Sequence, residues 1–184
     1  MQSYIDFANK NGILLLEKGK CQFCGANVSD GIKECIDIFN NELDFSLDFY
    51  NPENLIYKFL SVDAHTLQHP EIHGRWNNHL HLTRLHLILH HKINWTHNSS
   101  IILSRCLNKY KQTHLDEYLI PPRPLERGTL TIIDIINHSQ NERKFKEMIR
   151  KWAMEVYTSW NKYHKTVEKI AEKYIDNTSD LQKI

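Results

Sequence analysis

The sequence predicts an all-α, single-domain helical bundle with a small zinc-knuckle corner near its N-terminus. Two observations predict the bundle: apolar residues recur at three- and four-residue steps along much of the chain, and signals for strands are weak throughout. A third observation, the Cys21-x-x-Cys24-Gly25 sequence, predicts the corner. The length of 184 residues fits one domain over residues 1–184, since a domain usually takes about 100–200 residues.

Two helices are expected to flank the knuckle in the N-terminal part of the chain. The first is expected over residues 1–17, with Gly19 as its stop signal. Residues 20–36 would form the Cys-x-x-Cys knuckle and the turn that follows it. Ser29 and Asp30 are typical N-cap residues. They precede a short helix whose apolar side chains recur at i, i+4, i+7 and i+11: Ile32, Ile36, Phe39 and Leu43.

Helices are also expected over residues 53–68, 76–91 and 99–110. Pro70 would end the first of these, because proline cannot continue a helix. The Pro-rich residues 121–124 predict an extended connector, and Thr131-x-x-Asp134 resembles a capping box that starts another helix. The clearest element is a long C-terminal helix over residues 140–175. Its apolar side chains form one stripe: Phe145, Ile149, Trp152, Val156, Tyr163, Val167, Ile170 and Tyr174.

Charge and hydropathy disfavour several classes of partner. The chain has 23 basic and 22 acidic residues, so no basic surface for nucleic acid is expected, and the region of Arg123, Arg127 and Lys144 is expected to be ordinary solvated surface. No apolar run approaches the roughly 18 residues of a membrane span, and the first residues do not resemble a signal peptide. We therefore expect a cytoplasmic protein with reduced cysteines. There, Cys-x-x-Cys is more often a metal or redox motif than half of a disulfide.

Cys21 and Cys24 are the first candidate zinc ligands. A Cys-x-x-Cys turn brings two sulfurs to adjacent tetrahedral positions, and Gly25 permits the positive φ that such a turn often needs. Cys35 is the nearest third ligand, and a histidine or Cys106 would be the fourth. Free thiols or a redox dithiol are the alternatives. A redox motif usually opens a helix after a strand, and no such strand is predicted.

Nine of the twelve histidines lie in the run from Asp63 to His97. On a helix with 100° per residue, His81 shares the face of Leu85 and Ile88. Its imidazole is therefore expected to point into the core, where its nitrogens need hydrogen-bond partners or a metal. The opposite face holds three histidines that are expected to be solvated, although a pair four residues apart, such as His86 and His90, can chelate a metal fortuitously: His79, His86 and His90. A second metal site or pocket is expected where inward side chains of different helices meet, with these candidates: Asp63, His81 and His164.

Several stretches, taken in order, resemble one known family. They are CQFCG (21–25), Cys35, VDAHTLQHP (62–70), HLTRL (81–85), GTLTIIDI (128–135) and WAMEVYTSWNKYHKTV (152–167). This series resembles the bacterial domain-of-unknown-function family numbered 5946. The resemblance implies a cytoplasmic bacterial protein and no particular activity. These positions of the sequence match the pattern of the family: Cys21, Cys24, Gly25, Cys35, Asp63, Gln68, His69, Pro70, His81, Thr131, Asp134, Trp152, Trp160 and His164. His65 and Tyr163 depart from the Tyr and His that are usual in the family.

Two hypotheses of function follow from these candidates. In the first, a closed tetrahedral zinc site is structural, and an unassigned protein or small-molecule partner carries the function; its ligands are Cys21, Cys24, Cys35 and His69. In the second, the protein is a metal-dependent enzyme, hydrolase or transferase-like, with Asp63 as orienting group or base and an open metal site formed by His69, His81 and His164. Iron would also suit a histidine-rich site. A zinc-knuckle module for nucleic acid or protein is a third alternative, and the near-neutral charge disfavours nucleic acid.

Overall fold

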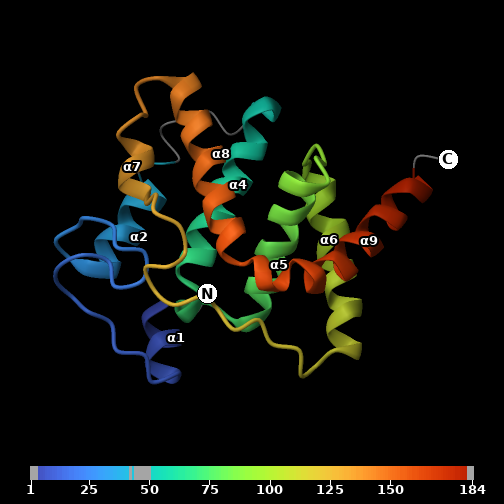
Figure 1. The fold of residues 1–184 in the computed structure, drawn as a ribbon, viewed down its shortest axis with the longest axis horizontal. Helices are drawn as coiled ribbons and strands as arrows, with labels where there is room; N and C mark the ends of the chain where they lie inside the picture. The colour runs from blue at the N-terminus through green and yellow to red at the C-terminus, as the bar shows by residue number, and fades with distance from the viewer. Residues whose placement is uncertain (1–3, 42, 44–50, 182–184) are drawn as a thin grey trace.

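The computed structural model describes residues 4–41, 43 and 51–181. Within these ranges the regular elements are helices, and a single isolated bridge joins Gly19 to Asp30, so the all-α prediction is confirmed. The centre of the bundle is a pair of helices that lie side by side, α4 (Pro52–Gln68) and α8 (Glu142–Ser159) (Figure 1). No helix in the described part of the chain combines the length and apolarity that a bilayer crossing requires.

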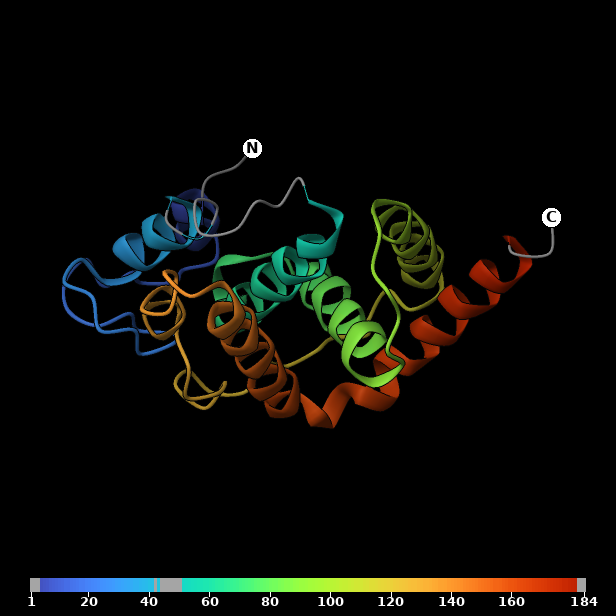
Figure 2. The same cartoon turned by 90° about the horizontal axis from the view of Figure 1, so that it is seen from above.

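Two groups of helices flank this central pair. On one side lie α1 (Tyr4–Lys10), α2 (Gly31–Asn41) and the short α7 (Ile132–Ile136). On the other side lie α5 (Arg75–Leu85), α6 (His97–Thr113) and α9 (His164–Leu181). Figure 2 shows α6 and α9 at the end of the molecule that is opposite α1 and α2. Short segments join these helices: the 3-10 turns Pro70–Ile72 and Asn161–Tyr163, and a π-helical turn, His86–His90.

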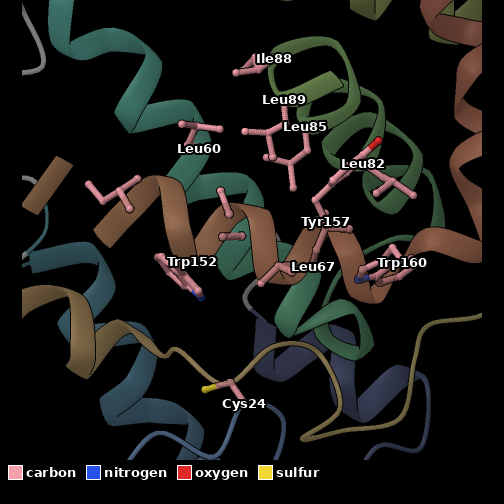
Figure 3. Close-up of a cluster of buried hydrophobic side chains, with 14 of the residues drawn as sticks. Cys24, Leu60, Leu67, Leu82, Leu85, Ile88, Leu89, Trp152, Tyr157 and Trp160 are labelled. Carbon is pink, nitrogen blue, oxygen red and sulfur yellow. The ribbon is translucent and has the colours of Figure 1, made fainter. Parts of the chain in front are cut away.

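The core forms where the inner faces of α4, α5 and α8 meet (Figure 3). Leucines from α4 and α5 pack there with two tryptophans, and their side chains are fully buried: Leu60, Leu67, Leu82, Leu85, Trp152 and Trp160. Burial of a large apolar side chain contributes about 1.5–3 kcal/mol, so this cluster supplies much of the driving force for folding. Cys24 enters the same view from the N-terminal segment, at the edge of the cluster. The knuckle therefore packs onto the core and does not project from it.

Several helices form where the sequence predicts them. The helix expected over residues 53–68 is α4, and α6 contains the one expected over residues 99–110. The capping box at the start of α7 is also present, because a carboxylate oxygen of Asp134 accepts hydrogen bonds from the backbone N–H and the hydroxyl of Thr131, both at 2.8 Å. These ends form locally, since each is fixed by a side chain within one turn of the helix.

Two helices are shorter than predicted. The helix expected over residues 1–17 ends at Lys10, because Gly12 takes a φ of +67° and the side chain of Asn11 donates back to the carbonyl of Phe7. The long helix expected over residues 140–175 is also wrong, since it breaks into α8 and α9 around Trp160. There the carbonyl of Tyr157 accepts from the N–H of Trp160 and from Nε2 of His164, which ends the α-helical pattern. The continuous apolar stripe gives no sign of this one-turn interruption.

Candidate metal centre

The knuckle is a tight turn held by backbone hydrogen bonds. The N–H of Gly25 donates to the carbonyl of Cys21 at 2.8 Å, and the N–H of Cys21 donates to Ala26 at 3.0 Å. Gly25 has a φ of +79°, the left-handed region that favours glycine. A Cβ atom there would lie 3.2 Å from the side chain of Leu125, whose N–H in turn donates to the carbonyl of Phe23. The turn thus brings both sulfurs of the motif to one side and is covered by the connector before α7.

Three separate segments bring four ligand atoms together. Cys21 and Cys24 come from the knuckle, Cys35 from α2, and His69 from the residue that ends α4. The one ligand atom that each side chain offers lies within 4.8 Å of every other, and all four residues are buried. The four residues chosen from the sequence as one ligand set are therefore adjacent in the structure. Their positions would allow them to hold a metal ion, and no disulfide joins the cysteines.

Three separations between these atoms can be compared with the edges of a tetrahedral zinc site. The Sγ atom of Cys21 is 3.4 Å from Nε2 of His69, Sγ of Cys35 is 3.6 Å from the same nitrogen, and Sγ of Cys24 is 3.7 Å from Sγ of Cys35. With Zn–S bonds of about 2.3 Å and Zn–N bonds of about 2.0 Å, the edges of a tetrahedral site measure roughly 3.5–3.8 Å. These three separations, out of the six between the four donors, agree with such a site.

A backbone carbonyl on the side away from the cysteines fixes the orientation of the His69 ring. Its Nδ1 atom lies 2.6 Å from the carbonyl oxygen of His65, one turn earlier in α4. Because a carbonyl can only accept, Nδ1 carries the proton, and Nε2 is the atom that faces the sulfurs. Histidine ligands of metals usually donate their other ring N–H in this way. His65 itself packs flat against Phe39, and its Nε2 atom is 3.9 Å from Sγ of Cys35.

The four side chains also polarise one another. Hydrogen bonds with Cys24 and Cys35 hold the pKa of the Cys21 thiol far below its usual range. Hydrogen bonds with Cys21 and Cys24 instead raise the pKa of the Cys35 thiol. Burial alone would lower the pKa of His69, but hydrogen bonds with Cys21 and Cys24 raise it to about 10. Contacts within the cluster thus stabilise the thiolate of Cys21.

One family model matches most of the chain, including the Cys/His group. The model of a family of unknown function, DUF5946, matches residues 19–161. The chain belongs to this family. The matched residues include all four members of the Cys/His group, and the family expected from the sequence is confirmed. No curated protein and no solved structure matches the chain.

Asp63 and His81, the other inward candidates in this DUF5946 protein, form a buried polar pair. Nδ1 of His81 is 2.6 Å from Oδ1 of Asp63, and Nε of Arg84 donates to both carboxylate oxygens at 2.8 and 3.0 Å. Asp63 is fully buried and its charge is neutralised by Arg84, whose guanidinium also lies over the ring of Phe59. Burial lowers the pKa of His81. The pair is satisfied by hydrogen bonds within the core.

His164 does not join Asp63 and His81. Its ring stacks on Tyr157 at 4.0 Å, and its Nε2 atom donates to the carbonyl of that residue at 3.0 Å. The centroid of the His164 ring lies 5.7 Å from the centroid of the His86 ring. The three histidines of the expected open site, His69, His81 and His164, do not form one group either. His69 lies with the three cysteines instead.

The predicted faces of the helix from residue 76 onward are wrong for two histidines. His79 and His86 were expected in solvent, but both are buried, and only His90 of that face is exposed. Helix α5 packs against α4, α6, α8 and α9, so more than one of its faces is covered. The turn that follows α5 is π-helical, which also shifts the angular positions of later residues. Face assignment from a regular 100° step cannot anticipate either effect.

Sequence reasoning missed two further groups. One is a second set of close ligand atoms on His86, His90, His91 and Glu168. Its sequence signal is the i, i+4, i+5 spacing of three histidines. The other is Arg127, which is buried although a solvated position was expected. Its guanidinium donates to the carbonyls of Pro122 and Gln68 at 2.8 and 2.9 Å and pairs with Glu71. Arg127 thereby ties the connector to the end of α4, next to His69.

Proposed function

We propose that this protein is a zinc-binding helical protein in which the ion is structural. The proposed ligands are Cys21, Cys24, Cys35 and His69. The observation that carries the proposal is the set of separations of 3.4, 3.6 and 3.7 Å between their donor atoms, which agree with the edges of a tetrahedral zinc site. Three thiolates and one imidazole are the donor types that zinc prefers, and softer sulfur donors disfavour magnesium and calcium.

Burial and ligand number support a structural role. Catalytic zinc sites usually keep one coordination position for water or substrate, whereas four protein ligands fill a tetrahedral site. Here all four candidate ligands are buried, with exposures of 1% for Cys21, 6% for Cys24 and 0% for Cys35 and His69. An ion in this position would join the knuckle, α2 and the end of α4. Its binding would contribute to folding directly, on the order of 10 kcal/mol.

The surroundings of the thiols support zinc over redox chemistry. In redox Cys-x-x-Cys motifs the first cysteine usually opens a helix, and the helix end lowers the pKa of the reactive thiol. Cys21 and Cys24 instead lie in a turn between Gly19 and Gly25, and the next helix begins at Gly31. We place the protein in the cytoplasm, where cysteines stay reduced and available to zinc. In this proposal a protein or small molecule is the functional partner, since the net charge of +1 disfavours nucleic acid.

Elemental analysis together with X-ray absorption at the zinc edge tests the proposal. Protein purified with zinc should hold one ion whose ligand shell contains three sulfurs and one nitrogen. A strong chelator should then lower the thermal midpoint markedly, because the binding free energy is lost from the folded state. A shell with fewer than three sulfurs, or a chelated protein that unfolds at an unchanged temperature, would contradict a structural Cys3His site.

A further inference from the structure

We propose a second metal site, distinct in chemistry from the cysteine cluster, in which His86, His90, His91 and Glu168 bind one divalent first-row transition ion. The donor atoms of these four side chains lie within 4.8 Å of one another. Three imidazoles and one carboxylate suit zinc, cobalt, nickel, iron or manganese, and they offer no sulfur. The site goes beyond the proposed zinc function, because it shares no residue with the cysteine cluster.

The local helix geometry gathers the three histidines. Residues His86–His90 form a π-helical turn, and the N–H of His91 donates to the carbonyl of His86 at 3.2 Å, five residues back. In a π turn, residues i, i+4 and i+5 flank the same side. The rings of His86 and His90 accordingly stack at 4.8 Å, and the ring of His91 stands edge-on to both, at 5.2 and 4.9 Å. Single π turns inside helices occur frequently at functional sites.

Glu168 supplies the fourth donor from a different helix. It lies on α9, and its carboxylate contacts Nε2 of His86 and lies 3.0 and 3.1 Å from Nε2 of His91. The packing of α9 against the π turn thus sets a negatively charged oxygen beside two imidazole nitrogens. A divalent ion between them would replace these hydrogen bonds by coordination and would offset the charge of the carboxylate.

A hydrogen-bond partner outside the four ligands orients the most buried histidine. Nδ1 of His86 lies 2.6 Å from the hydroxyl of Tyr157, so Nε2 is the nitrogen that faces Glu168. This arrangement, with one ring nitrogen engaged by an outer partner, is typical of metal-ligating histidines. The ring of His164 packs on Tyr157 and borders the same pocket.

The proposed site opens to solvent. It lies in a pocket of about 340 Å³ whose lining includes His86, His90, Glu168 and His164. His90 is exposed and Glu168 is 30% exposed, in contrast to the buried cysteine cluster. An ion that takes more than four ligands, such as nickel, iron or manganese, would leave room here for water or a small ligand. Glu168 lies beyond the residues matched by the DUF5946 family, so this donor set is not contained in the family match.

Cobalt(II) titration distinguishes the two sites, because only thiolate ligands give intense sulfur-to-cobalt absorption. The wild-type chain should take up two equivalents, one with that absorption and one without. The substitutions His90→Ala and Glu168→Gln should remove the second equivalent and leave the sulfur band intact. Tyr157→Phe removes only an outer hydrogen-bond partner, so it should lower the metal affinity of this site by roughly 10–100-fold. The two ligand substitutions should lower that affinity by more. His97→Ala, which removes an exposed histidine outside both sets, should behave as wild type.

The readouts separate this proposal from the zinc proposal. Absence of the sulfur band with retention of a weaker cobalt spectrum would contradict only the cysteine site. Uptake of a single, sulfur-bound equivalent by the wild-type chain would overturn the second site, as would two unchanged equivalents in His90→Ala and Glu168→Gln. Circular dichroism of these two variants checks that the helices are intact, and both side chains are accessible enough that their replacement leaves the core in place.

Discussion

Cys21 and His69 lie 48 positions apart in the sequence, and Sγ of the first is 3.4 Å from Nε2 of the second. The contact joins a turn with no regular structure to the end of the most central helix. Backbone hydrogen bonds set the shape of the turn, whereas its attachment to the end of α4 depends on its side chains. An ion shared by both ends would close a long loop and remove conformational freedom from the unfolded chain.

Loss of a single cysteine of the cluster should abolish zinc binding and destabilise the fold. In Cys35→Ser, one of three thiolates is replaced by a poor zinc ligand at a fully buried position. We expect less than one-tenth of the wild-type zinc content and a thermal midpoint close to that of the chelated protein. The matched control is Cys106→Ala, a buried cysteine outside the cluster, which should keep its zinc. Full zinc content in the Cys35 variant would remove this residue from the ligand set.

Gly25→Ala should strain the knuckle. An L-residue in the left-handed region costs about 1–2 kcal/mol, and the new Cβ would lie 3.2 Å from Leu125. At roughly 2–4 °C per kcal/mol for a chain of this size, the midpoint should fall by about 2–8 °C. Gly74→Ala is the matched control, because Gly74 has an ordinary φ of −66° and open space around it. Calorimetry measures both, and equal midpoints would show that the turn accommodates the methyl group.

Asp63→Asn should destabilise the core through Arg84. The substitution removes the carboxylate charge that is paired with the buried guanidinium of Arg84, and breaking a buried ion pair costs about 3–5 kcal/mol. Urea unfolding should show this loss at neutral pH. The exposed residue Asp116 provides the control, since Asp116→Asn should leave the free energy of unfolding within about 0.5 kcal/mol of wild type. A similarly small effect at Asp63 would mean that Arg84 finds another partner.

Arg127→Met should loosen the connector that covers the knuckle. The guanidinium is 1% exposed, and its loss would leave the carbonyls of Gln68 and Pro122 without their donors. We expect a loss of about 3 kcal/mol, from unpaired buried acceptors and the broken pair with Glu71. Proteolysis within residues 121–130 should also accelerate. Arg123→Met, four residues earlier and exposed, should change neither measurement.

Local chemistry explains which parts of this fold are predictable. The capping box at Thr131 and Asp134, and the proline that ends α4, act within one helical turn, so their sequence signals are complete. The Cys-x-x-Cys turn is local in the same sense. The residues alone left its fourth ligand open between a histidine and Cys106, and His69 is one of the positions that the family resemblance carries over. The orientations of His79 and His86 depend instead on which helices pack around α5. The break at Trp160 depends on a hydrogen bond from His164 back to Tyr157, which no periodicity encodes.

The π turn at His86–His90 gives the chain an unusual sensitivity to its own length. Deletion of one residue from this turn would convert it to ordinary α-helix and rotate His91 by about 100° about the helix axis. The four residues of the cysteine cluster all precede this turn in the chain, while His91 would move away from Glu168. A single codon could therefore create or erase one donor set in this lineage and leave the other intact. Among homologues, the spacing between the leucines of α5 and the last histidine of the run would reveal which members have kept it.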